Sequence, residues 1–407
     1  MDLDNLDTFR IATCDLNGQM RGKRMPQKDQ RKLASGDLRM PLSVLNVDIW
    51  GADIINSPLL FASGDGDGYL LPTNRGPVPM PWLDQPSALV GMWMFEEDGR
   101  PFEGDPRHAL AQILDRYAAR GWQVVAATEL EFYLIDDSAE SLRPPKDPTS
   151  NRKIDSSAIL SLQQLDAFEP FFSELYQSCA QMGINAQAAS SEAGIGQFEI
   201  SLQHGDALRI ADDTWLFKAL LKGLARKHGY AASFMAKPYP NDAGNGLHLH
   251  FSVIDEAGEN IFDDGTKQGS PLLQNAIAGC LATMRAATLG FAPHANSYTR
   301  MDPENHAPTS ICWGYENRTA ALRIPAGAHR TRRIEHRVAG GDINPFLTLS
   351  LILGAALLGI EDDLTPPPPI TGNAYSQDLP QLIHSWPEAI DMFENDPMIA
   401  RILPAQL

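Results

Sequence analysis

The sequence predicts an α+β protein in which a small β-rich unit precedes a larger domain of strands and helices. The 407 residues are 43% hydrophobic, which is enough for a large core and about two or three domains. Strand candidates separated by turns fill the first hundred residues, and the first helix signal follows at Asp105-Pro106. Four later segments alternate apolar and polar residues, as half-buried strands do. We therefore predict a first domain over residues 1–103 and a second over residues 104–407.

The first unit contains three strand candidates, which span 11–16, 42–47 and 88–95. The acidic loop 63–68 superficially resembles a calcium site. It lacks the third acidic ligand and the closing glutamate of an EF-hand, because Gly76 stands at that position. We interpret this loop as a turn.

Helix signals then alternate with strand patterns. Asp105-Pro106 places a cap before a first-turn proline, and Gly121 ends that helix. Asn344-Pro345 opens an apolar helix in the same way, and the prolines of 366–369 form an extended loop. Between them, the sequence predicts a strand over 124–134 and helices over about 166–183, 213–229 and 270–290.

The overall charge excludes several classes of partner. The net charge is −18 and the pI is about 4.9, so nucleic acid and anionic membranes are not expected partners. The acidic N-terminus has no apolar run, and the longest apolar run, 346–360, is shorter than a membrane span. Four cysteines without a C-x-x-C pair are typical of reduced thiols. These features predict a cytoplasmic protein.

The alternating segments carry chemically active side chains on one face each. Period-2 alternation in a sheet that curves on itself would direct these side chains into one cavity. Glu192 lies across a glycine turn from the second of these segments. The polar faces carry Glu129 and Glu131, then Glu199, then His248, His250 and Ser252, and finally Arg333, Glu335 and Arg337.

Such a cavity would be strongly acidic. Like charges within about 4–6 Å resist joint ionisation, and bound divalent cations resolve this conflict. An oxygen-rich set with one imidazole, His248, suits Mg²⁺ or Mn²⁺ better than zinc. Two such ions would offset most of the five charges, which belong to Glu129, Glu131, Glu192, Glu199 and Glu335.

A cluster of arginines follows in the sequence and indicates an anionic ligand, because guanidinium groups bind phosphate and carboxylate oxygens in pairs. Together with two metals, it points to phosphoryl transfer from a nucleotide. No P-loop is present, and Gly194-Ile-Gly196 leads into a strand rather than a helix, so any nucleotide is bound by other means. The cluster comprises Arg300, Arg318, Arg323, Arg330, Arg332, Arg333 and Arg337, of which Arg330 and Arg332 could equally pair with surface acids.

Six motifs, in their order and spacing, resemble the glutamine synthetase family. They are Glu129-Leu-Glu131, Glu192-x-x-x-Gly-Gln-Phe-Glu199, Gly244-Asn-Gly-Leu-His-Leu-His250, Asn296-Ser-Tyr-Thr-Arg300, Asn317-Arg-Thr-Ala-Ala-Leu-Arg-Ile-Pro325 and Arg333-Ile-Glu-His-Arg337. Within the family, the chain is most similar to the γ-glutamylputrescine synthetase branch. The features of that branch are Asp15-Leu-Asn-Gly18, Arg21-Gly-Lys-Arg24, Phe234-Met-Ala-Lys-Pro238 and Arg337-Val-Ala-Gly-Gly.

The resemblance implies a β-grasp N-terminal domain and a catalytic domain whose curved antiparallel sheet forms a funnel backed by helices. It assigns one metal to Glu131, Glu192 and Glu199 and the other to Glu129, His248 and Glu335. His250, Ser252, Arg323 and Arg333 would hold ATP. Arg318 would act on the transferred phosphoryl group. Glutamate would be bound by Arg300, Arg337 and the Gly244 backbone, beside Glu131 and His248.

The implied reaction is ATP-dependent ligation of glutamate to an amine. ATP would phosphorylate the γ-carboxylate of glutamate, and an amine would displace phosphate from the γ-glutamyl phosphate. Asp48 is similar to the family's N-terminal-domain aspartate, which reaches a neighbouring subunit's site and helps deprotonate the amine. A lone Asp at a strand end is also often a turn residue.

Two departures from the family pattern favour an amine larger than ammonia, such as a polyamine or alkylamine. His306 stands where ammonia-using members have a flap glutamate, and a neutral imidazole cannot anchor a small cation as a carboxylate can. Glu304, two residues earlier, could substitute. Thr73 stands where the first domain of relatives has a second acid.

Alternative interpretations are an ammonia-using glutamine synthetase, a ligase for another acid, and a catalytically silent member with a binding role. The last would be favoured by a lost metal ligand, and the matching positions are all retained. The chain ends soon after the proline-rich loop, without the tail that joins two rings in many relatives. We therefore expect a homo-oligomer of one hexameric ring, with a dodecamer of two stacked rings as the alternative.

Overall fold

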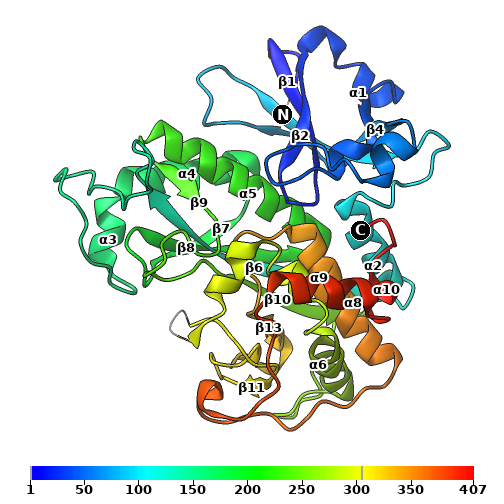
Figure 1. Cartoon of the computed structure of the whole chain (residues 1–407), viewed down its shortest axis with the longest axis vertical. Helices are drawn as coiled ribbons and strands as arrows, with labels where there is room; N and C mark the ends of the chain where they lie inside the picture. The colour runs from blue at the N-terminus through cyan, green and yellow to red at the C-terminus, as the bar shows by residue number, and fades with distance from the viewer. Residues whose placement is uncertain (1, 304–305) are drawn as a thin grey trace.

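The computed structural model describes residues 2–303 and 306–407 and contains two separate sheets. The first sheet lies at one end of the molecule, in blue in Figure 1. Its strand order is β2-β1-β5-β4-β3, and only the β1–β5 pair is parallel. The strands are β1 (Thr8–Cys14), β2 (Met20–Pro26), β3 (Arg39–Pro41), β4 (Asp67–Pro79) and β5 (Ala88–Phe95).

Two of the three strands predicted in this unit are confirmed, as β1 and β5. The strand predicted over 42–47 is wrong: Leu42–Leu45 forms a 3₁₀ helix, η2, which the Asn46 N–H closes by donating to the Ser43 carbonyl. Two strands of this sheet were not predicted. The charged residues of β2 suit an exposed edge strand. The glycines and prolines of β4 are atypical of strands and accompany a register shift between Pro72 and Pro77.

The second sheet is the larger one, and it curves. Its order is β11-β12-β13-β10-β6-β8-β7, with β9 pairing beside β6, and only β11–β12 is parallel. The predicted α+β fold with a curved, mainly antiparallel sheet is confirmed. The strands are β6 (Gln123–Ile135), β7 (Ala186–Ser191), β8 (Gln197–Asp206), β9 (Ala231–Ser233), β10 (Leu247–Ile254), β11 (Trp313–Tyr315), β12 (Leu322–Ile324) and β13 (Ile334–His336).

The predicted helices are confirmed, with two corrections to their bounds. The helix predicted to begin near residue 213 begins at Ala207. The helix predicted to reach about residue 290 ends at Thr283, and a short helix follows it. The side chains of Asp105 and Asn344 cap α2 and α8 by accepting hydrogen bonds from first-turn backbone N–H groups. The helices are α1 (Lys32–Ser35), α2 (Pro106–Ala118), α3 (Leu162–Ala167), α4 (Glu169–Met182), α5 (Ala207–Lys227), α6 (Pro271–Thr283), α7 (Thr288–Phe291), α8 (Pro345–Glu361), α9 (Trp386–Asn395) and α10 (Ile399–Ile402).

The helices cover the apolar face of the second sheet. The apolar α8 packs against α2, α5 and α6, and α5 also packs against β6 and β8. Leu130, Ile200 and Leu249 are at most 1% exposed, as their alternation predicts. The opposite faces of these strands are therefore free to line a site. No helix in the described part of the chain is long and apolar enough to cross a membrane.

The division at residue 103 stays a prediction, although the strands of the two sheets lie on either side of it.

Candidate active site

Strand register places the predicted acidic and imidazole side chains in one row across four strands. Glu131 pairs with Glu199 between β6 and β8, and Glu129 pairs with His248 between β6 and β10. His250 of β10 pairs in turn with Glu335 of β13. Residues directly opposite each other on neighbouring strands share a face, so these side chains meet on one side of the sheet.

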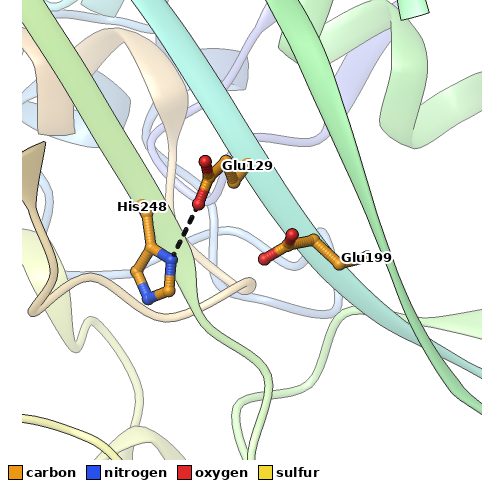
Figure 2. A group of neighbouring side chains, drawn as sticks. All are labelled: Glu129, Glu199 and His248. Carbon is orange, nitrogen blue, oxygen red and sulfur yellow. Dashed lines mark hydrogen bonds and ion pairs between the residues drawn. The ribbon is translucent and has the colours of Figure 1, made fainter. Parts of the chain in front are cut away.

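The distances confirm that the side chains converge. His248 Nδ1 lies 3.3 Å from Glu129 Oε2, and His250 Nε2 lies 3.2 Å from Glu129 Oε1. Figure 2 shows Glu129, Glu199 and His248 approaching one another from three neighbouring strands. Ligand atoms of two groups lie within 4.8 Å of one another, Glu129–Glu199–His248 and Glu129–His250–Glu335. Each group contains Glu129, which occupies the centre of the row.

Glu131 is held by the backbone of the neighbouring loop. Its Oε2 accepts a hydrogen bond from the Gly246 N–H at 2.6 Å and another from Gln197 Nε2 at 3.3 Å. Gln197 is buried and also donates to the Gly244 carbonyl at 2.9 Å. A Cβ at Gly246 would lie 2.7 Å from an Arg300 nitrogen, so a side chain there would displace this guanidinium from the loop. The loop 244–246 thus places Glu131 and Arg300 side by side.

The electrostatics of the row are unbalanced without a cation. Burial and the charge of Glu129 raise the pKa of Glu199 to about 9, while burial and the charge of Glu131 raise the pKa of Glu192 to about 7. Burial alone would also raise the pKa of Glu129, but contacts with His248 and His250 outweigh it and hold that pKa well below its usual range. The carboxyl groups of Glu192 and Glu199 therefore resist ionisation, because they are buried beside other acids without enough positive charge nearby.

The donor set fits hard divalent cations. It offers carboxylate oxygens with a minority of imidazole nitrogens, the combination that Mg²⁺ and Mn²⁺ accept. A cation between Glu199 and Glu129 would supply the positive charge that the raised pKa of Glu199 indicates is missing. The structure adds His250 to the possible ligands, because it lies with Glu129 and Glu335. How the six predicted ligands divide between two ions stays a prediction.

Arginines border the row at Glu335, on β13. Glu335, which is 1% exposed, forms ion pairs with Arg323 at 2.8 Å and with Arg337. Burial is the largest influence on the Glu335 carboxyl and acts to raise its pKa. The charges of Arg337, His248, His250 and Arg323 together outweigh burial and lower it. Arg300 is buried and donates to the Val338 carbonyl at 2.8 Å, directly after Arg337 in the sequence. The predicted glutamate-binding arginines thus lie beside the predicted metal ligands.

A cavity of about 500 Å³ opens over the row. Three of the four residues predicted to bind ATP line it, namely His250, Ser252 and Arg333. The fourth, Arg323, is not among its lining residues and pairs with Glu335 instead. Arg330 also lines the cavity, whereas Arg332 donates to the backbone carbonyls of 266 and 267. This cavity is large enough for a nucleotide.

A second cavity, of about 700 Å³, lies beside the loop 244–246. Ala193 and Ala243, which adjoin Glu192 and Gly244, line it together with His306. Arg318 is exposed, and its charge acts to lower the pKa of Glu192 against the larger effect of burial. Glu304 lies outside the described residues.

Two residues of the first domain lie outside the row. The Asp48 carboxylate accepts hydrogen bonds from the N–H groups of Trp50 and Ala52 at 2.9 and 2.8 Å, as a turn residue does. A role for Asp48 in a neighbouring subunit's site stays a prediction. Thr73 is buried within the first sheet, close to Gly91.

The comparisons with known proteins decide the family. The family model for the glutamine synthetase catalytic domain matches residues 103–407. The chain belongs to the glutamine synthetase family. Membership implies ATP and a divalent metal, and the groups around Glu129 supply donors for such an ion. The predicted family and enzyme class, a ligase of the glutamine synthetase family, are confirmed.

Relatives in the family include enzymes named for particular amines. The chain is 36% identical to γ-glutamylputrescine synthetase PuuA of Escherichia coli, over 96% of this chain and 84% of that protein. It is 32% identical to the glutamate–isopropylamine ligase of a Pseudomonas species, over 98% of this chain and 88% of that protein. A solved GmaS–ADP complex, 28% identical, matches with a TM-score of 0.85 over 98% of this chain and 90% of that one.

Gln197 and Gly246 are the site residues that the sequence analysis did not single out. Gln197 lies on the same face of its strand as Glu199, so the period-2 alternation contained the signal for it. Gly246 lies within a quoted motif, but nothing in a single sequence shows that its N–H donates to Glu131.

Proposed function

We propose that this ligase joins the γ-carboxylate of L-glutamate to an amine larger than ammonia, with conversion of ATP to ADP and phosphate. The observation that carries the proposal is the row of acids and imidazoles on β8, β6, β10 and β13, with arginines at one end. The relatives named as ligases for putrescine and isopropylamine support an amine as the second substrate.

The proposed roles follow the row from the nucleotide cavity to the glutamate arginines. His250, Ser252, Arg323 and Arg333 bind ATP, and Arg318 acts on the transferred phosphoryl group. Two Mg²⁺ or Mn²⁺ ions, held by Glu129, Glu131, Glu192, Glu199, His248 and Glu335, would neutralise charge on the phosphoryl oxygens when bound. Arg300 and Arg337 orient the carboxylates of glutamate, beside Glu131 and the Gly244 backbone.

The amine would approach through the cavity beside His306. This cavity adjoins Glu192 and Gly244, next to the position proposed for the γ-carboxylate. His306 supplies an imidazole where a fixed negative charge would favour ammonium, and a volume of about 700 Å³ leaves room for an alkyl chain. Asp48 of a neighbouring chain is proposed to accept a proton from the attacking amine.

Turnover across a panel of amines tests this proposal. We expect kcat/KM for the best amine among putrescine, isopropylamine and ethanolamine to exceed that for ammonia by on the order of tenfold or more, about 1.4 kcal/mol. ADP release with glutamate and Mg²⁺, combined with mass spectrometry of the product, gives the measurement. The variant His306→Glu should shift this ratio toward ammonia.

Equal or faster turnover with ammonia would establish the main alternative, which is a glutamine synthetase. The matching family model carries the name of that enzyme. No ADP release with any amine would favour a catalytically silent member.

We further propose that the chain forms a homo-oligomer, with a single hexameric ring favoured over two stacked rings. Large apolar side chains that follow Asp48 in the sequence are exposed in the single chain, among them Ile55 at 73% and Phe61 at 74%. Burial of such a patch by a second copy would bring Asp48 toward another chain. Native mass spectrometry should report six chains, and a monomer would contradict the proposed role of Asp48.

A further inference from the structure

A cavity between the first domain and helix α5 lies apart from the acidic row and is unassigned by the proposed function. Its volume is about 420 Å³, within the range of small-molecule sites. Residues 18–21 and 49–50 of the first domain form one side, and residues 215–223 of α5 form the other. Three indoles, those of Trp50, Trp82 and Trp215, contribute to its lining.

The charge of this cavity is opposite to that of the whole chain. Arg21, Lys218 and Lys222 line it, and none of its described lining residues is acidic, although the net charge of the chain is −18. Arg21 is paired with Asp15 at 2.7 Å. Lys222 has no ion pair among the described residues: its Nζ lies 3.4 Å from Gln19 Oε1 and over the Phe234 ring, 6.0 Å from the centroid. The cavity therefore carries positive charge that its own lining does not neutralise.

Lys218 supplies a buried cation at the cavity wall. The residue is 6% exposed, and its Nζ donates to the carbonyls of Gly341 and Ile343 at 2.9 and 3.0 Å. Burial and the charge of Lys222 lower the pKa of Lys218 to about 8. Burial removes water from the Lys218 ammonium group and so disfavours its charge. An anion that approaches this ammonium group would stabilise the charge.

Two of the three indoles, those of Trp82 and Trp215, are packed closely against helix α5 or buried within it. A side chain at Gly223, inside α5, would lie 2.2 Å from the Trp82 ring, so the indole lies directly on the helix at this glycine. Trp215 is 5% exposed, and its indole N–H has no hydrogen-bond acceptor among the described residues. The walls thus offer flat apolar surface.

We infer that this cavity binds a small organic anion with a flat apolar body and a carboxylate or phosphate group. The anionic group contacts Lys218 and Lys222, and the flat body lies against the indoles. A neutral molecule of the same shape lacks the charge-assisted hydrogen bonds and binds more weakly.

Isothermal titration calorimetry on the purified protein, in its native assembly, tests this site. Phthalate and phenyl phosphate serve as probes that separate carboxylate from phosphate, and benzamide serves as the neutral probe. We expect at least one anion to bind, and the substitution Lys222→Glu to weaken its binding by on the order of tenfold or more. The matched control Lys28→Glu makes the same charge change at an exposed lysine of the first domain and should leave the affinity unchanged.

A second control separates this site from the proposed active site. The variant Glu335→Gln, altered in the acidic row, should bind the anion as the unchanged protein does, whether or not the proposed function is correct. Circular dichroism melts establish that Lys222→Glu is folded. Absence of binding by either anion, equal binding by Lys222→Glu, or equal affinity for benzamide would overturn the inference. The first of these outcomes is also the one expected if a second copy of the chain fills the cavity.

Discussion

Replacement of Glu335 by glutamine is expected to lower kcat on the order of 10³-fold, about 4 kcal/mol in the activation free energy. The Glu335 side chain is 1% exposed and lies in the Glu129–His250–Glu335 group. Its carboxylate is therefore held at the position of a metal ligand. Glutamine preserves the shape and one acceptor oxygen but removes the negative charge that a divalent cation requires. Steady-state ADP release with glutamate and the best amine gives the measurement.

The same substitution also weakens the ion pairs with Arg323 and Arg337, so its effect on folding needs a control. Glu316→Gln is matched, because Glu316 lies 3.5 Å from Arg323 but is half exposed and outside the row. We expect Glu316→Gln to retain turnover, and thermal unfolding to show both variants folded. Near-normal activity in folded Glu335→Gln would show that the metal assignment is wrong.

Arg300→Lys is expected to raise the KM for glutamate about 100-fold, about 2.7 kcal/mol, with a smaller effect on the KM for ATP. Arg300 is buried, its guanidinium lies against the loop 244–246, and one of its nitrogens is already engaged by the Val338 carbonyl. A lysine retains the charge, but it cannot hold that carbonyl and a carboxylate in one rigid plane. Initial rates with glutamate and ATP varied separately distinguish the two constants.

The control for this prediction is Arg285→Lys, which makes the same change at an arginine that pairs with Glu388 on the surface. Its kinetic constants should remain those of the unchanged protein. A rise in the KM for ATP without a rise in the KM for glutamate would place Arg300 at the nucleotide instead.

Much of the site was predictable because its residues obey the period of a strand. Glu129 and Glu131, or His248 and His250, are two residues apart, and two residues return a side chain to the same face. The facing pairs Glu131–Glu199 and Glu129–His248 follow once the strands are neighbours. Strand order itself is not local information, and here it rested on the resemblance to a known family.

The remaining features depend on contacts that a single sequence does not contain. The position of His250 next to both Glu129 and Glu335 follows from the side-chain conformations of three strands. In the first domain, β4 has the glycines and prolines of a loop, and its pairing with β5 prevails over those preferences. The cavity lined by Lys218 and Trp82 unites segments more than a hundred residues apart, so no local pattern marks it.

The number of divalent ions bound per chain shows whether the acids on β8, β6, β10 and β13 hold paired cations. Titration of the metal-free protein with Mn²⁺ in the presence of ADP, with free Mn²⁺ followed by electron paramagnetic resonance, should show two ions per chain. One of them should be lost in Glu335→Gln. Binding of no Mn²⁺, or the same number in the variant, would show that the acids on these four strands do not meet around paired cations.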